Sequence, residues 1–359
     1  MQDTIVVIVD KPFVANILAP FLVSKFKDAK IFTISTMYIG LYEFEYPRGL
    51  SFSDIPRLSD PRWKPRNIPD FSPVQEIFSD RAVKLDISPT EILSKATQIL
   101  FSSNMGSSGV IAFHTLISEC LGAEHAKAEY KTIVTYSLAP DAIEASLKNL
   151  WSTKDSWYEQ LLNTAQAKKF FDYNFNTNSL VVLGDLLRKF RVDTNQFIMS
   201  KFSLQVLYDL KERSAINIYD YAEILGQSWK GTGRYEQGQI GSATSRFTII
   251  DELIKNSLAQ VDNDNLLTIS VLGKAFLDRL HPDCCDPDLP FRLQEWGENP
   301  VAAQPKMERY LNTFFGKQKK FASKNRIQEE LHWSQGAMDE LKEYQKLYPP
   351  FKAGSGGNS

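Results

Sequence analysis

The chain has 359 residues, a length that favours two or three domains and excludes a single small module. Hydrophobic residues make up 43% and charged residues 23%, which is typical of a globular protein with a sizeable core and excludes a fibrous or wholly disordered chain. The 41 basic and 43 acidic side chains nearly cancel, so no overall field favours a polyanionic partner and any contact with nucleic acid must be local.

The sequence also argues against a membrane segment and a metal framework. No apolar run is long enough to span a bilayer, and residues 1–11 carry Asp3 and Asp10 where a signal peptide has basic residues, so we expect a cytoplasmic protein without membrane contact. Cys284 and Cys285 are adjacent and Cys120 stands alone, a spacing that suits neither a zinc pair nor a disulfide framework. We therefore expect no metal and no cofactor.

The N-terminal third has the pattern of an α/β layer. A β-branched run at residues 4–9 precedes an apolar helical pattern that contains Pro20, and a second strand, turn and helix follow from Thr97 to Leu121. Two such units predict a parallel sheet within residues 1–135. Six prolines between positions 47 and 73 exclude a long helix or a central strand there and predict a surface excursion.

The remainder predicts helices and then a small β-wing. Residues 141–213 have helical periodicity with expected breaks near Asn176 and Thr194, and a glycine cluster at 226–241 marks a boundary. Ser242 can cap a helix, residues 261–270 suit a tight β-hairpin, and residues 272–280 resume helix, an order that predicts a winged-helix fold. We expect an α/β domain at 1–135, a helical domain at 136–225, a winged-helix domain at 226–350 and a flexible tail at 351–359.

Several segments, in the right order, resemble the core of type IA DNA topoisomerases of the topoisomerase III kind. Residues 238–250, with Gly-Ser-Ala-Thr-Ser-Arg at 241–246, are similar to the glycine-rich run that opens a DNA-facing helix in that family. Residues 8–12, Ile-Val-Asp-Lys-Pro, resemble the opening strand of its Toprim domain, with Asp10 in place of a glutamate. Weaker similarities fall at five further segments: 109–114, 136–143, 166–172, 267–273 and 281–282.

This sequence departs from the family at the residues that bind the catalytic magnesium. The second Toprim strand of the family ends in an Asp-x-Asp-x-Glu-Gly run that holds magnesium, whereas residues 104–109 here are Asn-Met-Gly-Ser-Ser-Gly. A hard divalent cation needs several oxygen ligands, most of them anionic, and Asp10 alone is a poor replacement. The resemblance therefore implies a Toprim-like layer that has lost its metal site; a phosphate-binding nest at 102–109 is the weaker alternative.

The nucleophile of the family also has no counterpart. In type IA enzymes a tyrosine attacks the phosphodiester, and it lies in an insertion of several hundred residues, whereas about 35 residues separate Gln205 from Gly241 here. Tyr46-Pro47-Arg48 has a superficial likeness to the nucleophile motif, but it lies in the Toprim-like part, and we interpret it as a turn. Residues 200–205, Ser-Lys-Phe-Ser-Leu-Gln, also lack the glycine and arginine of the family's helical domain. We expect no catalytic residue in this chain.

The resemblance implies a set of DNA-binding residues along the groove that type IA enzymes use for single-stranded DNA: Arg246, Thr244, Ser242, Gln205, Lys168 and Lys11. For Arg246 the alternative is a solvated arginine on a capped helix, and for Lys11 it is an ordinary surface lysine. His114 and His281 have the sequence context of structural histidines rather than catalytic ones.

A second candidate surface lies at residues 301–330, which carry seven cations and three glutamates, with Phe314, Phe315 and Phe321 interleaved. Basic residues with aromatics suit single-stranded nucleic acid, and Lys317, Lys319 and Lys320 are the central cations. The alternative is an amphipathic helix with its aromatics in the core and its lysines in solvent.

Three functions remain open at this point. The first is a catalytically degenerate topoisomerase relative that binds DNA, with single strands favoured. The second is a scaffold for a protein partner built on the same core, and the third is an active enzyme that works with a partner chain. The near-neutral charge favours the second, and the basic patch with Arg246 favours the first.

Overall fold

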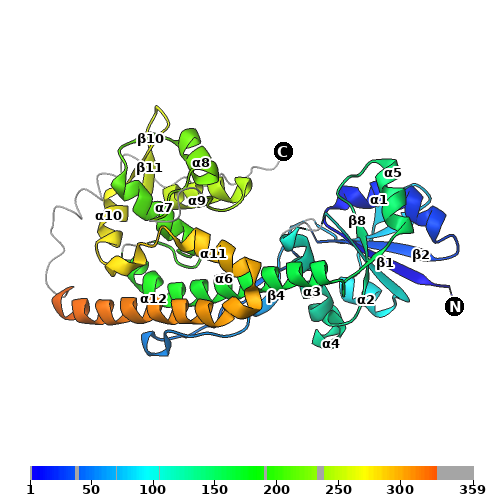
Figure 1. Ribbon diagram of the computed structural model, residues 1–359, viewed down its shortest axis with the longest axis horizontal. Coiled ribbons are helices and arrows are strands. Elements are labelled where there is room, and N and C mark those ends of the chain that lie inside the picture. Colours follow the sequence, from blue (N-terminus) through cyan, green and yellow to red (C-terminus); the bar gives the residue numbers. More distant parts are fainter. Residues whose placement is uncertain are drawn as a thin grey trace, which may run out of the picture. The chain divides into compact units, whose positions relative to one another are not determined.

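The computed structural model describes residues 2–36, 40–69, 71–104, 106–189, 192–232 and 238–329, without the side chains of Ser103, Thr244 and residues 325–329. The chain divides into two compact units (Figure 1). Unit 1 contains residues 1–46 and 61–169, and unit 2 contains residues 47–60 and 170–359. The boundaries near 135 and 225, and the tail at 351–359, which lies outside the described residues, stay predictions.

Unit 1 is built on a mixed seven-stranded sheet with the order β6-β5-β2-β1-β7-β8-β9. Its four central strands, β2, β1, β7 and β8, are parallel, and β5, β6 and β9 are antiparallel to their neighbours. The bounds are β1 Thr4–Val9, β2 Lys30–Ser35, β5 Val74–Phe78, β6 Arg81–Lys84, β7 Gln98–Ser103, β8 Lys131–Val134 and β9 Trp151–Ser152. The α/β layer predicted from the sequence is confirmed, with antiparallel strands added at both edges.

Helices cover both faces of this sheet. α1 (Pro12–Lys25) and α5 (Pro140–Lys148) pack on one face, against the side of β1 that carries Val7 and Val9. α2 (Pro89–Ser94) and α3 (Ser107–Leu121) pack on the other, against the side that carries Val6 and Ile8. β1 is buried on both faces, which explains why its sequence is apolar without alternation. The short helix α4 (Ala123–Ala126) and the ribbon of β3 (Tyr42–Phe44) and β4 (Trp63–Pro65) complete the unit.

Unit 2 is mainly helical, and its core contains many aromatic side chains. The long helix α6 (Ser156–Lys189) begins in unit 1 and continues into unit 2, where it lies beside α12 (Pro300–Glu329) (Figure 1). Phe175 of α6 contacts Phe314 and Phe315 of α12, with ring centroids 5.4 and 5.2 Å away. The other helices are α7 Lys201–Glu212, α8 Ile218–Gln227, α9 Ala243–Lys255, α10 Val271–Leu277 and α11 Leu289–Glu298, with a 3-10 turn η2 at Pro282–Cys284.

The helix, wing and helix predicted after Ser242 are present as elements. α9 is followed by β11 (Ala259–Val261), β12 (Leu266–Ile269) and α10, and β10 (Ile216–Asn217) adds a third strand in the order β10-β12-β11. The Ser242 side chain accepts a hydrogen bond from the Ser245 backbone N–H, which is the expected N-cap. The assignment of these elements to a winged-helix domain stays a prediction.

Part of the proline-rich stretch packs on unit 2. Residues 47–60, which we call the strap, lie largely at the surface, as expected, but they belong to unit 2 and bury Ile55 to 1% exposure. Asn174 and Asn178, fully buried on α6, each accept from a backbone N–H of the strap and donate to the carbonyl of the same residue, Ser59 and Arg57 respectively. The break expected at Asn176 is wrong, because α6 runs through it. Each asparagine amide donates both to the strap and to the helix carbonyl four residues earlier, that of Phe170 or Asn174, so the side chains satisfy the strap without interrupting the helix.

None of the helices that the structure describes is long and apolar enough to cross a membrane.

Candidate functional site

The ends of the parallel strands of unit 1 place Asp10 and Lys11 beside the loop that follows β7. Asp10 is 4% exposed, and its Oδ2 accepts from the Asn104 backbone N–H at 3.4 Å. Asn104 in turn accepts from the Gly106 N–H at 3.0 Å, just before α3 begins. The loop at 104–106 is thus adjacent to Asp10, whose carboxylate accepts a hydrogen bond from it.

This arrangement offers few ligands for a metal. Among the side chains that the structure describes, no three His, Cys, Asp or Glu residues gather into a possible metal site. The loop residues beside Asp10 are Asn104 and Gly106, which offer a metal only neutral oxygen ligands. A hard divalent cation prefers anionic oxygens. Asp10 is one such ligand, and it is already engaged by a backbone amide.

Lys11 and Lys168 lie on the surface of unit 1. Lys11 is the N-cap residue of α1 and is half-buried, and its Nζ lies 5.6 Å from the centroid of the Phe13 ring. Lys168 is exposed on α6. The Lys168 side chain is accessible to an anionic partner.

Arg246 is placed on the first turns of α9, but its guanidinium is directed to the backbone of its own loop. Its Nε donates to the Ile240 carbonyl at 3.1 Å, and its Nη2 donates to the Gly241 carbonyl at 3.3 Å. The guanidinium also fills the space over Gly226, where an added Cβ would lie 2.5 Å from Nη1. Arg246 therefore fixes the loop before α9 to the end of α8, and it is neither simply solvated nor presented to a partner.

The rest of the α9 surface carries little positive charge. Ser242 is exposed, but its hydroxyl caps the helix and shares a second bond with Ser245, while the Thr244 side chain lies outside the described part of the structure. Phe247 is 48% exposed on this surface, and Asp251, one turn later, forms an ion pair with the exposed Lys255. The β11–β12 turn adds Asp262 and Asp264, so this region is not electropositive.

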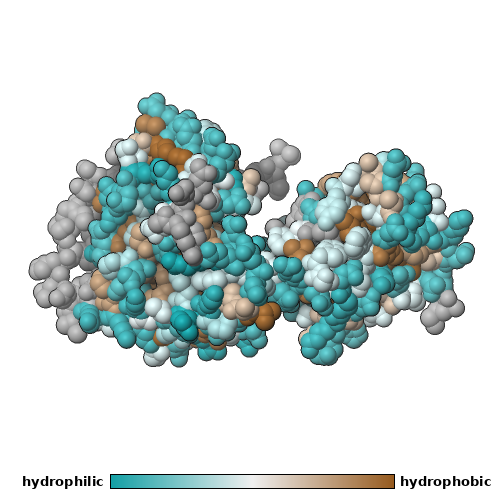
Figure 2. Space-filling model, viewed as in Figure 1, coloured by the Kyte–Doolittle hydropathy of each residue, from teal (hydrophilic) through white to brown (hydrophobic). Residues whose placement is uncertain are grey.

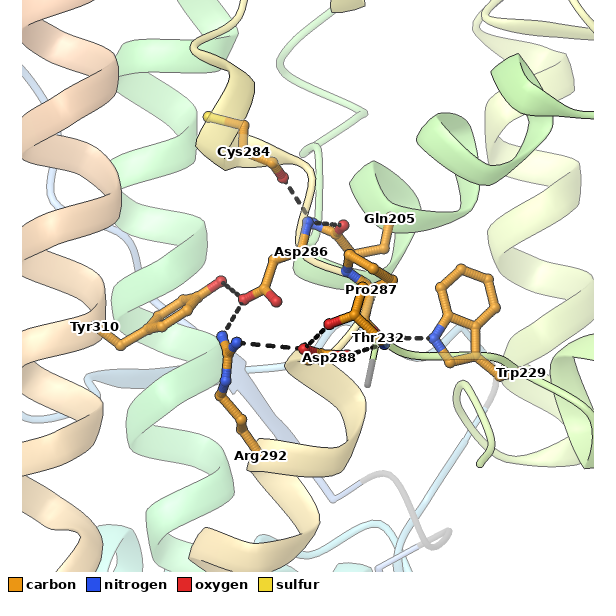
Figure 3. A network of polar contacts seen from close by, with 9 residues as sticks. All are labelled: Gln205, Trp229, Thr232, Cys284, Asp286, Pro287, Asp288, Arg292 and Tyr310. Carbon is orange, nitrogen blue, oxygen red and sulfur yellow. Dashed lines mark hydrogen bonds and ion pairs between the residues drawn. The ribbon is translucent and has the colours of Figure 1, made fainter. Parts of the chain in front are cut away.

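Gln205, one of the DNA-binding candidates from the sequence, is 1% exposed on α7. Its Nε2 donates to the Cys284 carbonyl at 2.9 Å, and its Oε1 accepts from the Asp286 backbone N–H at 2.7 Å (Figure 3). Both polar atoms of the amide are occupied by backbone groups, so Gln205 presents no group to DNA in this structure.

The Gln205 contacts belong to a larger buried network that the sequence analysis missed. Asp286 accepts from Arg292 Nη1 at 2.5 Å and from the Tyr310 hydroxyl at 2.8 Å, while Asp288 accepts from both the backbone and the hydroxyl of Thr232 at 2.5 Å (Figure 3). Trp229 Nε1 donates to the Pro287 carbonyl at 2.9 Å. The sequence feature at its centre is the Asp-Pro-Asp run at 286–288, which by itself does not indicate where its carboxylates find partners.

This network ties α7, α11, α12 and the segment 229–232 together, and it has the chemistry of a structural junction. Both aspartates are 9% exposed, and burial together with the Asp286 carboxylate raises the pKa of Tyr310 well above its usual range. Tyr310 therefore remains a neutral hydrogen-bond donor. The adjacent thiol is also inert, because burial raises the pKa of Cys284 to about 12.

The helix α12 carries a row of exposed cations. Its buried side is formed by Met307, Leu311, Phe314 and Phe315, so these two aromatics lie in the core as the amphipathic alternative predicted. Its outward side carries five exposed cations, which we call the α12 stripe: Lys306, Arg309, Lys317, Lys320 and Lys324. Small hydrophobic patches are scattered over a mostly hydrophilic surface on the face that Figure 2 shows.

The three lysines singled out from the sequence are used differently. Lys317 forms an ion pair with Asp283. Lys319 donates to the Ser53 and Ile55 carbonyls at 2.9 and 2.6 Å, which fastens the strap to α12. Lys320 is exposed, like Lys306, Arg309 and Lys324, and it remains available to a partner.

His114 and the tyrosine of the possible nucleophile motif have local roles. His114 is 7% exposed between the Ala126 carbonyl and the Tyr158 hydroxyl, at 3.0 and 3.1 Å, and burial lowers its pKa to about 4. The imidazole is therefore neutral at pH 7, and it donates from Nδ1 to the carbonyl and accepts at Nε2. Tyr46 packs on Phe44, with ring centroids 5.9 Å apart.

Comparison with known proteins gives a partial structural likeness. No protein-family model and no curated protein matches this sequence. The chain is structurally similar to full-length topoisomerase I from Thermotoga maritima, with 15% identity and a TM-score of 0.35 over 58% of this chain. The match covers 30% of the Thermotoga chain, so this protein spans less than a third of that enzyme's length. The likeness concerns the backbone alone, and no residue role is transferred from it.

Proposed function

We propose that this protein binds DNA on a core of the type IA topoisomerase kind and does not cleave it. The observation that carries the proposal is the α12 stripe, which presents five exposed cations on one side of a helix whose other side is buried. Cations that neutralise phosphates release condensed counterions, and this supplies most of the sequence-independent affinity for DNA. The sequence resemblance supports DNA as the polyanion.

The absence of cleavage is part of the same proposal. A type IA reaction needs a tyrosine nucleophile and carboxylates that hold magnesium, and residues 104–109 supply no acid beside Asp10. We expect no relaxation of supercoiled DNA in magnesium and no covalent adduct. A tyrosine-linked oligonucleotide trapped under denaturing conditions, with or without a partner chain, would contradict this part.

The proposed DNA binding does not include the preference for single strands that the sequence suggested. That preference rested on three aromatic side chains interleaved with the lysines. Phe314 and Phe315 are 5% and 0% exposed in the core, and Phe321 is half-buried with its ring centroid 5.6 Å from that of His281. Bases cannot stack on rings that the fold has buried.

The test is a titration by fluorescence anisotropy at 50 and 200 mM salt, with labelled single-stranded and duplex DNA. The wild type should bind at low salt, and Lys320→Glu with Lys324→Glu should weaken binding about tenfold or more and lower the salt slope by roughly two. Lys84→Glu, an exposed lysine on β6, is the matched control and should change little. Absence of binding at low salt would contradict the proposal.

A second candidate is a scaffold for a protein partner, and one observation favours it. The exposed side of α9 carries Phe247 rather than free cations, and the adjacent turn is acidic, which suits a protein surface better than a phosphate backbone. If DNA binding fails, capture of a partner that Phe247→Ser abolishes would establish this function instead.

A further inference from the structure

The cations of the α12 stripe occupy one narrow side of the helix. At 3.6 residues per turn, positions 306, 309, 317, 320 and 324 fall within an arc of about 80°. Glu308, the acidic residue among them, lies on the far side of that arc and accepts a hydrogen bond from Gln304. The stripe therefore presents cations without an intervening carboxylate of its own helix.

Along the helix axis these cations form two groups. Lys306 and Arg309 stand near the start, and Lys317, Lys320 and Lys324 stand beyond an uncharged interval at 310–316. With a rise of 1.5 Å per residue, about 16 Å separate Arg309 from Lys320, the facing members of the two groups, and their long flexible side chains can reach inward from that spacing. The major groove of B-form DNA is about 12 Å wide, with phosphates along both rims.

The interval between the two groups can lie over a groove without reading bases. Its exposed side chains are Asn312 and Thr313, which are short and uncharged, while Leu311, Phe314 and Phe315 point into unit 2. The long side chains lie in the two flanking groups and the short ones between them, an arrangement that suits a helix lying across the opening better than a recognition helix inside the groove. Contacts made in this way go to phosphates and carry no sequence information.

We propose that α12 binds B-form duplex DNA across the opening of the major groove, with Lys306 and Arg309 on one phosphate rim and Lys320 and Lys324 on the other. This rests on the proposed function and specifies its partner as a duplex. Lys317 adds less, because Asp283 neutralises it. A flexible single strand offers only one row of phosphates at a time, and A-form RNA has a deep and narrow major groove, so neither fits the two groups as well.

The test compares a 20-base-pair DNA duplex, its separated strands and an RNA duplex of the same sequence, at equal phosphate concentration and two salt concentrations. Wild type should bind the DNA duplex several-fold more tightly than either alternative, without preference between unrelated sequences. Lys306→Glu with Arg309→Glu and Lys320→Glu with Lys324→Glu should each weaken duplex binding about tenfold and lower the salt slope by roughly two. Glutamine versions of both pairs serve if a reversed variant does not fold, with circular dichroism as the check.

Each outcome separates this inference from the function on which it rests. Equal or tighter binding of the single strands, or a loss caused by only one of the two pairs, overturns the duplex inference and leaves DNA binding in place. Equally tight binding to vesicles that contain anionic lipid overturns it as well, because the stripe would then recognise any polyanionic surface. If neither form of DNA binds at low salt, the proposed function fails with it.

Discussion

The polar residues of unit 2 fall into an inward set and an outward set, and the two are used in opposite ways. Arg246 and Gln205, the residues to which the sequence resemblance points, give their side-chain atoms to backbone groups of their own fold. The α12 stripe keeps most of its cations in solvent. A sequence motif can therefore place a residue correctly in a fold. Whether its side chain can also contact a partner depends on whether nearby backbone groups already bind it.

The largest effect should come from Gln205, which is more buried than Arg246. Gln205→Ala leaves the Asp286 N–H and the Cys284 carbonyl buried without partners, which costs about 2–4 kcal/mol of unfolding free energy. Chemical denaturation measures this, with Gln166→Ala, an exposed glutamine on α6, as the control. If the two variants are equally stable, Gln205 is not the structural link that its contacts indicate.

A residue of unit 1 allows a similar test by pH. His114 is buried and hydrogen-bonded within its own fold, and its imidazole can titrate. Burial lowers its pKa from 6.5 to about 4, so the unfolded chain binds a proton between these values that the folded chain does not. The stabilisation is complete above pH 6.5 and is lost as pH falls toward 4, by about 3 kcal/mol in all. Hydrogen exchange of residues 107–121 at several pH values measures it. His114→Gln, which cannot titrate, should flatten the profile, and an unchanged profile would assign the pH dependence elsewhere.

Arg246→Ala should distinguish structure from binding directly. We expect about 1–2 kcal/mol of lost stability, because the Ile240 and Gly241 carbonyls lose a charged donor, and no change in DNA affinity or salt slope. The family resemblance predicts the reverse, a loss of one phosphate contact. Melting and DNA titration of the same preparation decide between the two.

The smallest effect on stability belongs to the outward set. Lys320→Ala should change the unfolding free energy by less than about 0.5 kcal/mol, because the side chain is exposed on the helix surface. The same substitution should lower the salt slope of DNA binding by roughly one. A destabilisation comparable to that of Arg246→Ala would place Lys320 in the inward set.

Local patterns made the backbone elements of this protein predictable, and long-range contacts made most side-chain roles unpredictable. The apolar run at 4–9 and the Ser242 cap depend on neighbours in sequence, and both were found. The partners of Gln205 lie 79 and 81 residues away, and those of Asn174 and Asn178 lie 115 and 121 residues away. Sequence periodicity does not indicate contacts over such separations, so the sequence did not predict the packing of the strap or the partners of Asp286. Phe314 and Phe315 were ambiguous because a helix pattern does not tell which aromatic faces the core.

Because the strap belongs to unit 2 but lies in sequence between two parts of unit 1, the two units cannot be separated by one cut in the chain. Residues 47–60 are synthesised before most of unit 1, yet their hydrogen-bond partners, Asn174, Asn178 and Lys319, are synthesised long afterwards. During translation, more than a hundred further residues must be added before the asparagine side chains that hydrogen-bond to this segment exist. An expression fragment that begins at residue 170 lacks it altogether and exposes the α6 asparagines. Dissection of this protein into working halves therefore requires that the strap be supplied with unit 2, by fusion or as a separate peptide.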